Sequence, residues 1–177
     1  MPPAASSRKS APQKLQVCLV GDSAAGKTAM ANHLAEIAGS LSTSYTPTQG
    51  CRVLEFDTRV VPAGKTRETS VAIELWDLSG QKRYAACWPV LVPHPHAVIY
   101  VSAPPEATTA TGAAAPNTLV NPRWLQLYPD VAPEQQAIFA QHDGHRAAQD
   151  GIRVARVDLR NPESIAEAFH SVIARAV

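Results

Sequence analysis

Residues 21–28 read Gly21-Asp22-Ser23-Ala24-Ala25-Gly26-Lys27-Thr28, which fits the pattern G-x-x-x-x-G-K-[ST]. In this pattern the glycines let the backbone curl, so that successive N–H groups and the start of the next helix face phosphate groups. The lysine reaches the outer phosphates, and the hydroxyl residue after it ligates Mg²⁺. The apolar run 15–20 predicts a buried strand before the loop, and residues 28–38 predict a helix after it. We therefore expect a nucleoside triphosphate to bind at Asp22, Ser23, Ala24, Ala25, Gly26, Lys27, Thr28 and Ala29.

Further strands are predicted where apolar residues alternate or run continuously. They cover residues 51–57, 71–75, 96–102, 137–140 and 152–157. The first two are joined through a turn at Pro62-Ala63-Gly64. The run Val98-Ile99-Tyr100-Val101 is apolar throughout, which is typical of a parallel strand covered on both faces.

A final helix is predicted near the end of the chain. Asn161 is a good cap, Pro162 suits the first turn, and Ile165, Phe169 and Ile173 repeat at the spacing of one helical face. Strands and helices therefore alternate along the chain. This order predicts the α/β class, with a mostly parallel sheet and helices on both faces.

Length and composition indicate one domain, because 177 residues suffice for a single core. Residues 1–13 carry Pro and Ser around isolated basic residues, and we expect them to be a flexible tail. Residues 14–177 form the domain. Within it, residues 102–118 are rich in Ala, Thr and Pro and predict a flexible insertion.

Charge and hydropathy exclude several functions. The formal net charge of +1 argues against a broadly basic surface, so no nucleic acid partner is expected. There is no run of about 20 apolar residues that would predict a transmembrane helix. The sequence ends Ala174-Arg175-Ala176-Val177 without a cysteine, so we expect no direct lipid anchor there. Membrane association would then depend on a partner.

Two later segments narrow the fold further. Thr46-Pro47-Thr48 follows the first predicted helix, and Trp76-Asp77-Leu78-Ser79-Gly80-Gln81 follows a predicted strand. With the phosphate loop before them, they resemble the switch regions of Ras-like GTPases. The resemblance implies a single P-loop GTPase domain and makes residues 14–177 a small GTPase-like domain.

The same resemblance implies roles for individual residues. Thr48 would ligate Mg²⁺ together with Thr28, and Asp77 would hold the ion through water. The Gly80 N–H would contact the terminal phosphate, and Gln81 would be the catalytic residue that orients the attacking water. The implied cofactors are GTP or GDP and Mg²⁺.

The flanking sequence adds a narrower resemblance. Residues 45–56 (YTPTQGCRVLEF), 74–80 (ELWDLSG) and 87–91 (CWPVL) are similar to the Rab-like GTPases of intraflagellar transport. The implied location is the cilium or flagellum, the basal body and the cytoplasm. The implied partners are the paired coiled-coil subunits of intraflagellar transport complex B, intraflagellar transport proteins 74 and 81. Residues 45–50 and 80–93 would be the natural contact surface, since nucleotide-dependent switches change shape there.

The base site departs from the family pattern. Guanine is selected in that family by N-K-x-D, and this chain has Gln141-His142-Asp143-Gly144 in its place. Asp143 stands one residue before the usual aspartate position and would replace it only if the loop shifts. We therefore assign the base contacts to Gln141, His142 and Asp143. Losing a charged hydrogen-bond pair of about 1.5–3 kcal/mol would weaken binding roughly ten- to a hundredfold.

Two further departures affect function. The S-A-K element that backs the base is replaced by Asp158-Leu159-Arg160. Lys82 stands where glutamate often follows the catalytic glutamine, which argues against a conventional exchange factor. Pro89 disfavours helix at Trp88 and predicts a short second-switch helix. Trp88 then either forms an exposed docking surface or packs into the domain's own core.

Two functions remain open from the sequence. The first is a GTP-binding switch with slow hydrolysis that supports assembly of the transport complex and formation of the cilium or flagellum. The second is a structural adaptor that uses nucleotide only for folding. A P-loop kinase is a distant third, because no Arg-rich lid follows the loop.

Overall fold

The computed structural model describes residues 13–36, 46–102, 119–141, 148–149 and 151–177. Its strands are β1 (Gln13–Val20), β2 (Cys51–Val60), β3 (Thr69–Leu78), β4 (Ala97–Val101), β5 (Gln136–Ala140), β6 (Ala148–Gln149) and β7 (Ile152–Arg156). Its helical elements are α1 (Lys27–Leu34), η1 (Lys82–Cys87), α2 (Trp88–Leu91), α4 (Pro122–Leu125), η2 (Pro133–Gln135) and α5 (Pro162–Ala176).

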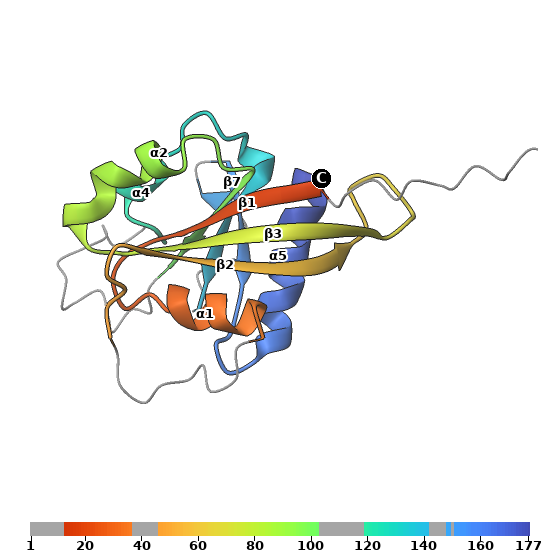
Figure 1. Ribbon diagram of the computed structural model, residues 1–177, viewed down its shortest axis with the longest axis horizontal. Coiled ribbons are helices and arrows are strands. Elements are labelled where there is room, and N and C mark those ends of the chain that lie inside the picture. Colours follow the sequence, from red (N-terminus) through yellow and green to blue (C-terminus); the bar gives the residue numbers. More distant parts are fainter. Residues whose placement is uncertain (1–12, 37–45, 103–118, 142–147, 150) are drawn as a thin grey trace, which may run out of the picture.

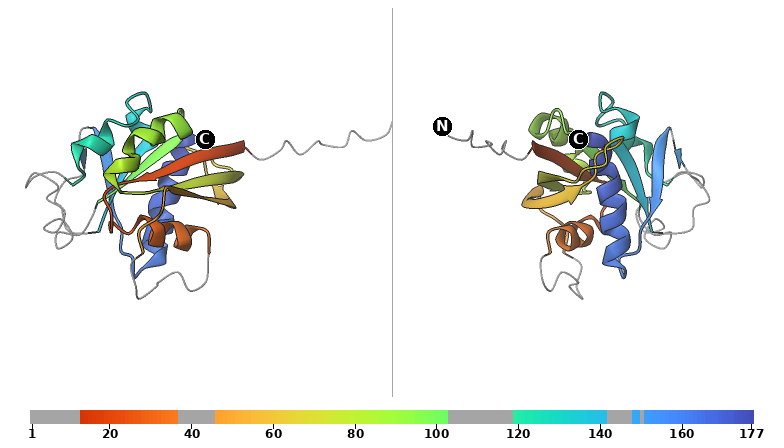
Figure 2. Two further views of the ribbon diagram at one scale, coloured as in Figure 1. Left: turned by 60° about the vertical axis from the view of Figure 1, so that its left-hand side comes forward. Right: turned by 90° about the vertical axis from the view of Figure 1, so that its right-hand side faces the viewer.

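The described strands form one sheet with the order β2-β3-β1-β4-β5-β7-β6. The pairs β3–β1, β1–β4, β4–β5 and β5–β7 are parallel, whereas β2–β3 and β6–β7 are antiparallel. Figures 1 and 2 show α1 and α5 on one side of this sheet and α2 and α4 on the other. The predicted α/β class and mostly parallel sheet are confirmed.

Alternation along the strands builds two cores. In β1, Leu15, Val17 and Leu19 face α1 and α5, whereas Cys18 and Val20 face α2 and α4. All five side chains are fully buried. Central parallel strands bury both faces in this way, because helices cover both sides of the sheet. The carboxyl ends of β1 and β3 are thereby fixed next to each other, and the candidate site lies there.

The boundaries differ from the predictions in three places. The helix predicted over 28–38 ends at Leu34, and Glu36 has a positive φ of 54°, which breaks the helical path. The predicted hairpin is confirmed, but its strands reach Val60 and Thr69, so the turn is shorter than expected. β1 begins at Gln13, the last residue assigned to the tail. The rest of that tail and residues 103–118 of the predicted insertion lie outside the described residues.

The second-switch helix is short, as predicted, but it includes Trp88, where Pro89 was expected to disfavour a helical conformation. Trp88 has helical dihedral angles and begins α2, so Pro89 lies in the first turn, where its missing N–H costs nothing. The Trp88 side chain is buried and packs 5.9 Å, between ring centroids, from Tyr84. The core alternative for Trp88 is therefore correct, and the exposed apolar residues of α2 are Val90 and Leu91.

The predicted final helix is confirmed as α5. The Asn161 side chain accepts a hydrogen bond from the Glu163 N–H at 3.2 Å, and Pro162 occupies the first turn. Ile165, Phe169 and Ile173 are buried against the sheet. Phe169 also lies 6.1 Å, between ring centroids, from Phe56 of β2. The Phe169 ring thus connects α5 to the β2–β3 hairpin.

We expect Phe169→Ala to lower the free energy of unfolding by about 3–5 kcal/mol, because it leaves a cavity between α5 and the sheet. Urea unfolding followed by circular dichroism measures the change. Val90→Ala is the control, since this side chain is 79% exposed and its loss should cost less than about 0.5 kcal/mol. Equal costs for the two variants would contradict the packing of Phe169.

Candidate functional site

The loop 21–26 leaves β1 and curls into the first turn of α1. Gly26 precedes the helix with φ of 85°, and no side chain caps the helix start. A Cβ at Gly26 would lie 2.9 Å from Leu159 and 3.2 Å from Gln141, so the backbone there needs glycine both for its conformation and for space. The uncapped N–H groups of α1 remain available to an anion, as expected for a phosphate-binding loop.

Lys27, the first residue of α1, is buried against this loop. Its ammonium donates hydrogen bonds to the carbonyl oxygens of Gly21, at 2.9 Å, and Asp22, at 2.8 Å. Burial lowers the pKa of Lys27 to about 8, although the carboxylates of Asp77 and Asp22 act in the opposite direction. The lysine is thus held by the loop itself, and its cost of burial falls when a phosphate supplies negative charge.

Three oxygen-bearing side chains from three segments meet beside Lys27. The Thr28 hydroxyl donates to the Asp77 carboxylate at 2.7 Å and lies 2.9 Å from the Thr48 hydroxyl. Asp77 is fully buried, and its Oδ1 has no hydrogen-bond partner among the described residues. Burial raises the pKa of Asp77, although hydrogen bonding from Thr28 and the positive charges of Arg52 and Lys27 act to lower it.

This cluster fits Mg²⁺. Hard oxygen donors are the ligands that Mg²⁺ prefers, and it is usually held by few protein groups together with water and phosphate. An unpaired carboxylate oxygen at the end of a buried strand is costly unless a cation or water reaches it. The predicted metal residues Thr28, Thr48 and Asp77 are therefore brought together.

Arg52 is a member of this site that the sequence patterns did not reveal. Its Nε lies 3.3 Å from Asp77 Oδ2, and its other end donates to the Asn32 side chain of α1 at 2.7 Å. The register of the hairpin explains this ion pair, since Arg52 is directly opposite Asp77 across β2 and β3. Pairing of opposite charges across two strands is recognisable only once that register is known.

The two switch segments contact each other and the loop. The Ser79 N–H donates to the Gly50 carbonyl at 2.9 Å, and the Arg83 guanidinium donates to the Gln49 side chain at 3.2 Å. Gly80 lies so close to the loop that a Cβ there would be 2.3 Å from the Ser23 nitrogen. Only glycine fits this approach. The Gln81 N–H donates to the Ser79 hydroxyl at 3.3 Å, so the predicted catalytic residue directly follows the contact with the loop.

The loop residue Asp22 has partners from a distant element. Its carboxylate accepts hydrogen bonds from the Arg123 guanidinium and, at 3.1 Å, from the Trp124 indole N–H. Both belong to α4, which the sequence patterns did not connect with the loop. Ser23 and Ala24 lie in the loop and Ala29 in the first turn of α1; their predicted contacts with a nucleotide stay predictions.

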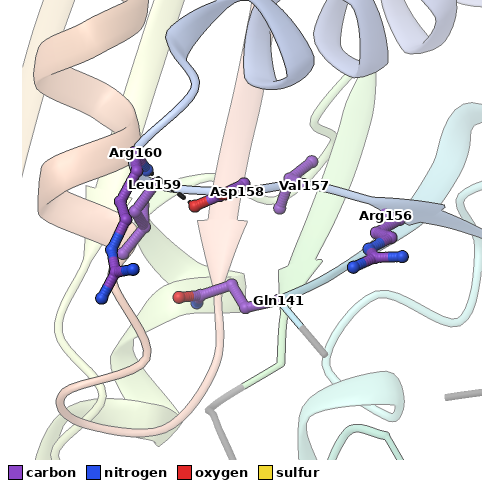
Figure 3. Close-up of a pocket in the computed structure, with 6 residues that line it drawn as sticks. All are labelled: Gln141, Arg156, Val157, Asp158, Leu159 and Arg160. Atoms are coloured by element: carbon purple, nitrogen blue, oxygen red, sulfur yellow. Dashed lines mark hydrogen bonds between the residues drawn. The ribbon is translucent and has the colours of Figure 1, made fainter. Parts of the chain in front are cut away.

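The base side of the site is a pocket of about 420 Å³ lined by Gln141, Arg156, Val157, Asp158, Leu159 and Arg160. Figure 3 shows Gln141 on one side of it and the segment 156–160 along the other. The Gln141 side chain donates to the Ala25 carbonyl at 2.6 Å and to the Ser102 carbonyl at 3.2 Å. The Asp158 side chain accepts a hydrogen bond from the Arg160 N–H at 2.8 Å, which stabilises the turn that contains both residues. The predicted base residues His142 and Asp143 lie outside the described residues.

Comparison with known proteins agrees with the phosphate-binding geometry of the site. The model for "Ras of Complex, Roc, domain of DAPkinase" matches residues 16–143. The intraflagellar transport protein 22 homolog of Danio rerio is 38% identical over 91 residues, which is 51% of this chain and 48% of that protein. The Homo sapiens homolog is 40% identical over 88 residues, 50% and 46% of the two chains. The intraflagellar transport associated protein 2 of Caenorhabditis elegans is 37% identical over 70 residues, 35% and 28%. The match spans about half the length of the first two relatives.

The buried Lys27 predicts a distinctive pH dependence in the nucleotide-free protein. Its pKa is about 8 in the folded state, below the ordinary lysine value of 10.5, so the unfolded chain binds more protons between these values. The free energy of unfolding should therefore rise with pH over this window, by about 3 kcal/mol, and stay unaffected by Lys27 below pH 8.

Urea unfolding of wild type and Lys27→Met at pH 7.5, 9 and about 10.5 tests this, because the variant lacks the titrating group. The difference between them should move in favour of wild type as the pH rises. Lys65→Met removes an exposed lysine and controls for the loss of one positive charge. A pH-independent difference for Lys27→Met would show that the ammonium is not buried.

Proposed function

This chain belongs to the family of Ras-like GTPase domains described by the Roc (Ras of Complex) model, and from that premise we propose that it is a GTP-binding subunit of intraflagellar transport. The observation that carries the proposal is the convergence of Thr28, Thr48 and Asp77 beside the buried Lys27. In this arrangement the Lys27 ammonium, which can bind phosphates, lies next to three side-chain oxygens that can bind Mg²⁺. Slow GTP hydrolysis and a role in assembly are part of the proposal.

Each residue would act through a simple interaction. Lys27 and the N–H groups of the loop would neutralise and orient the outer phosphates, and Thr28, Thr48 and Asp77 would hold Mg²⁺ beside them. Gly80 offers its N–H to the terminal phosphate, and Gln81 orients the attacking water. These residues position the phosphates and the water, and none of them takes part in covalent chemistry. Unassisted turnover should therefore be slow, on the order of 10⁻⁴ per second.

The assignment to intraflagellar transport rests on the relatives, and the choice of partners on the sequence resemblance. The names of the similar proteins place those proteins in intraflagellar transport. We propose that this chain works in the cilium or flagellum, at the basal body and in the cytoplasm. We also propose that it docks on intraflagellar transport proteins 74 and 81. The segments 46–50 and 79–84, which are joined by hydrogen bonds, form the surface that a terminal phosphate and Mg²⁺ would reshape.

A second candidate function is a structural adaptor without a switching cycle. It is favoured by two contacts that hold the site together from within the chain. Arg52 pairs with Asp77 on the metal side, and Gln141 is hydrogen-bonded to the carbonyl of Ala25 on the base side. In this alternative, nucleotide adds stability to the fold by mass action, and turnover has no role.

Gln81→Leu distinguishes catalysis from binding. The variant should retain GTP affinity but lose hydrolysis, because only the water-positioning amide is removed. Single-turnover hydrolysis of radiolabelled GTP measures the rate, and titration of fluorescent GTP measures the affinity. Gln13→Leu is a matched control, since this glutamine is exposed at the start of β1, at the opposite end of the strand from the phosphate loop. Equal hydrolysis rates for wild type and Gln81→Leu would remove Gln81 from the mechanism.

Thr28→Asn tests whether nucleotide affects assembly. Disturbing the ligation of Mg²⁺ should weaken binding to the coiled-coil pair about five- to a hundredfold, the usual range of coupling between two sites. Calorimetry measures the affinity, and circular dichroism checks that the variant is folded. Thr66→Asn, in the exposed turn of the hairpin, is the control. Unchanged binding by a folded, nucleotide-free Thr28→Asn would support the structural adaptor.

A further inference from the structure

The phosphate-binding loop contains a carboxylate, which is an unfavourable group beside a polyphosphate. Asp22 is the only acidic residue among residues 21–28. Its backbone carbonyl accepts a hydrogen bond from the Lys27 ammonium at 2.8 Å, so it lies in direct contact with the residue that faces the phosphates. Like charges repel strongly where solvent is largely excluded, so an uncompensated Asp22 would oppose nucleotide binding.

Two side chains of α4 compensate this charge. Arg123 forms an ion pair with Asp22 Oδ1, and the Trp124 indole N–H donates to the same oxygen at 3.1 Å. The Asp22 and Arg123 side chains are 15% and 29% exposed, so solvent screens the pair only partly. The guanidinium carbon also lies 4.5 Å from the centroid of the Trp124 ring, which favours one orientation of the arginine.

The element that carries these residues is firmly anchored. Trp124 is buried, and it packs in the core on this face of the sheet with Tyr128. The Asn121 side chain accepts from the Arg123 N–H at 3.2 Å and so caps the start of α4. Arg123 therefore reaches the loop from a fixed position.

The opposite side of Asp22 is occupied by the second switch segment. A Cβ at Gly80 would lie 2.4 Å from the carbonyl carbon of Asp22. The side chain of Asp22 is thus held by α4, while its main chain touches Gly80 and Lys27. A change in the charge or position of Asp22 would be transmitted to both phosphate-contacting residues.

We propose that Arg123 is a positioning residue of the phosphate site, which neutralises Asp22 and holds the loop for the nucleotide. The proposal rests on the proposed function, since it concerns nucleotide binding at the same site. Loss of Arg123 alone would leave the Asp22 carboxylate with only the neutral Trp124 donor, so its negative charge would be uncompensated. Loss of both charges removes the repulsion, so the double variant recovers affinity that the single variant loses. GTP should suffer more than GDP, because it carries more negative charge.

The experiment compares wild type, Arg123→Met, Asp22→Asn and the double variant by titration with fluorescent GTP and GDP in the presence of Mg²⁺. Asn at position 22 keeps an acceptor for the Trp124 indole. We expect Arg123→Met to weaken GTP binding at least tenfold, about 1.4 kcal/mol or more, and GDP binding less. The double variant should lie within about threefold of wild type. Arg59→Met, which removes an exposed arginine of β2, is the control and should bind normally.

The outcomes separate this proposal from the function on which it rests. If wild type and Arg59→Met bind neither nucleotide, the proposed function fails and this inference with it. If wild type binds but Arg123→Met equals it, or the double variant is as weak as Arg123→Met, only the role of Arg123 is overturned. Circular dichroism reports folding. If Arg123→Met is unfolded, Arg123→Gln replaces it, because glutamine keeps a hydrogen-bond donor without the charge.

Discussion

The buried carboxylate of Asp77 connects the parts of the molecule that surround the phosphate site. It lies at the end of β3, accepts from Thr28 of α1 and pairs with Arg52 of β2, and Thr28 in turn contacts Thr48. Placing a carboxylate in the interior is costly unless partners surround it, and removing one partner of a buried pair leaves an uncompensated charge. The relative positions of α1, the hairpin and the first switch segment therefore depend on this one group.

The sequence predicted the parts of the fold and site that are encoded locally. The phosphate loop, the central strands and α5 each have a signal within a few residues, through glycine spacing, apolar runs or a capping asparagine. Trp88 was ambiguous because its burial depends on the core residues that α4 and the following segment supply, including Tyr128. The end of α1 was missed because no glycine or proline stands where the helix stops at Leu34.

Arg52 and Arg123 were missed for a different reason. Their roles depend on contacts between segments that are 25 and 101 residues apart, Arg52 with Asp77 and Arg123 with Asp22. No periodicity within one segment reports such contacts. The base side shows the same limit, since Gln141 was predicted from its place in the chain, but its bonds to Ala25 and Ser102 follow from the meeting of three loops. These two hydrogen bonds connect the phosphate loop to the segments that follow β4 and β5.

The position of β2 at the edge of the sheet affects how copies of this chain interact at high concentration. β2 lies at the edge of the described sheet, and its exposed positions include Glu55, Asp57 and Arg59. An unprotected edge offers backbone groups to any strand of another molecule, and charged side chains along it oppose such joining. At high local concentration, copies of this chain should therefore resist pairing with one another through the edge of β2. On this side of the molecule, contacts would then be made by side chains instead of by added strands.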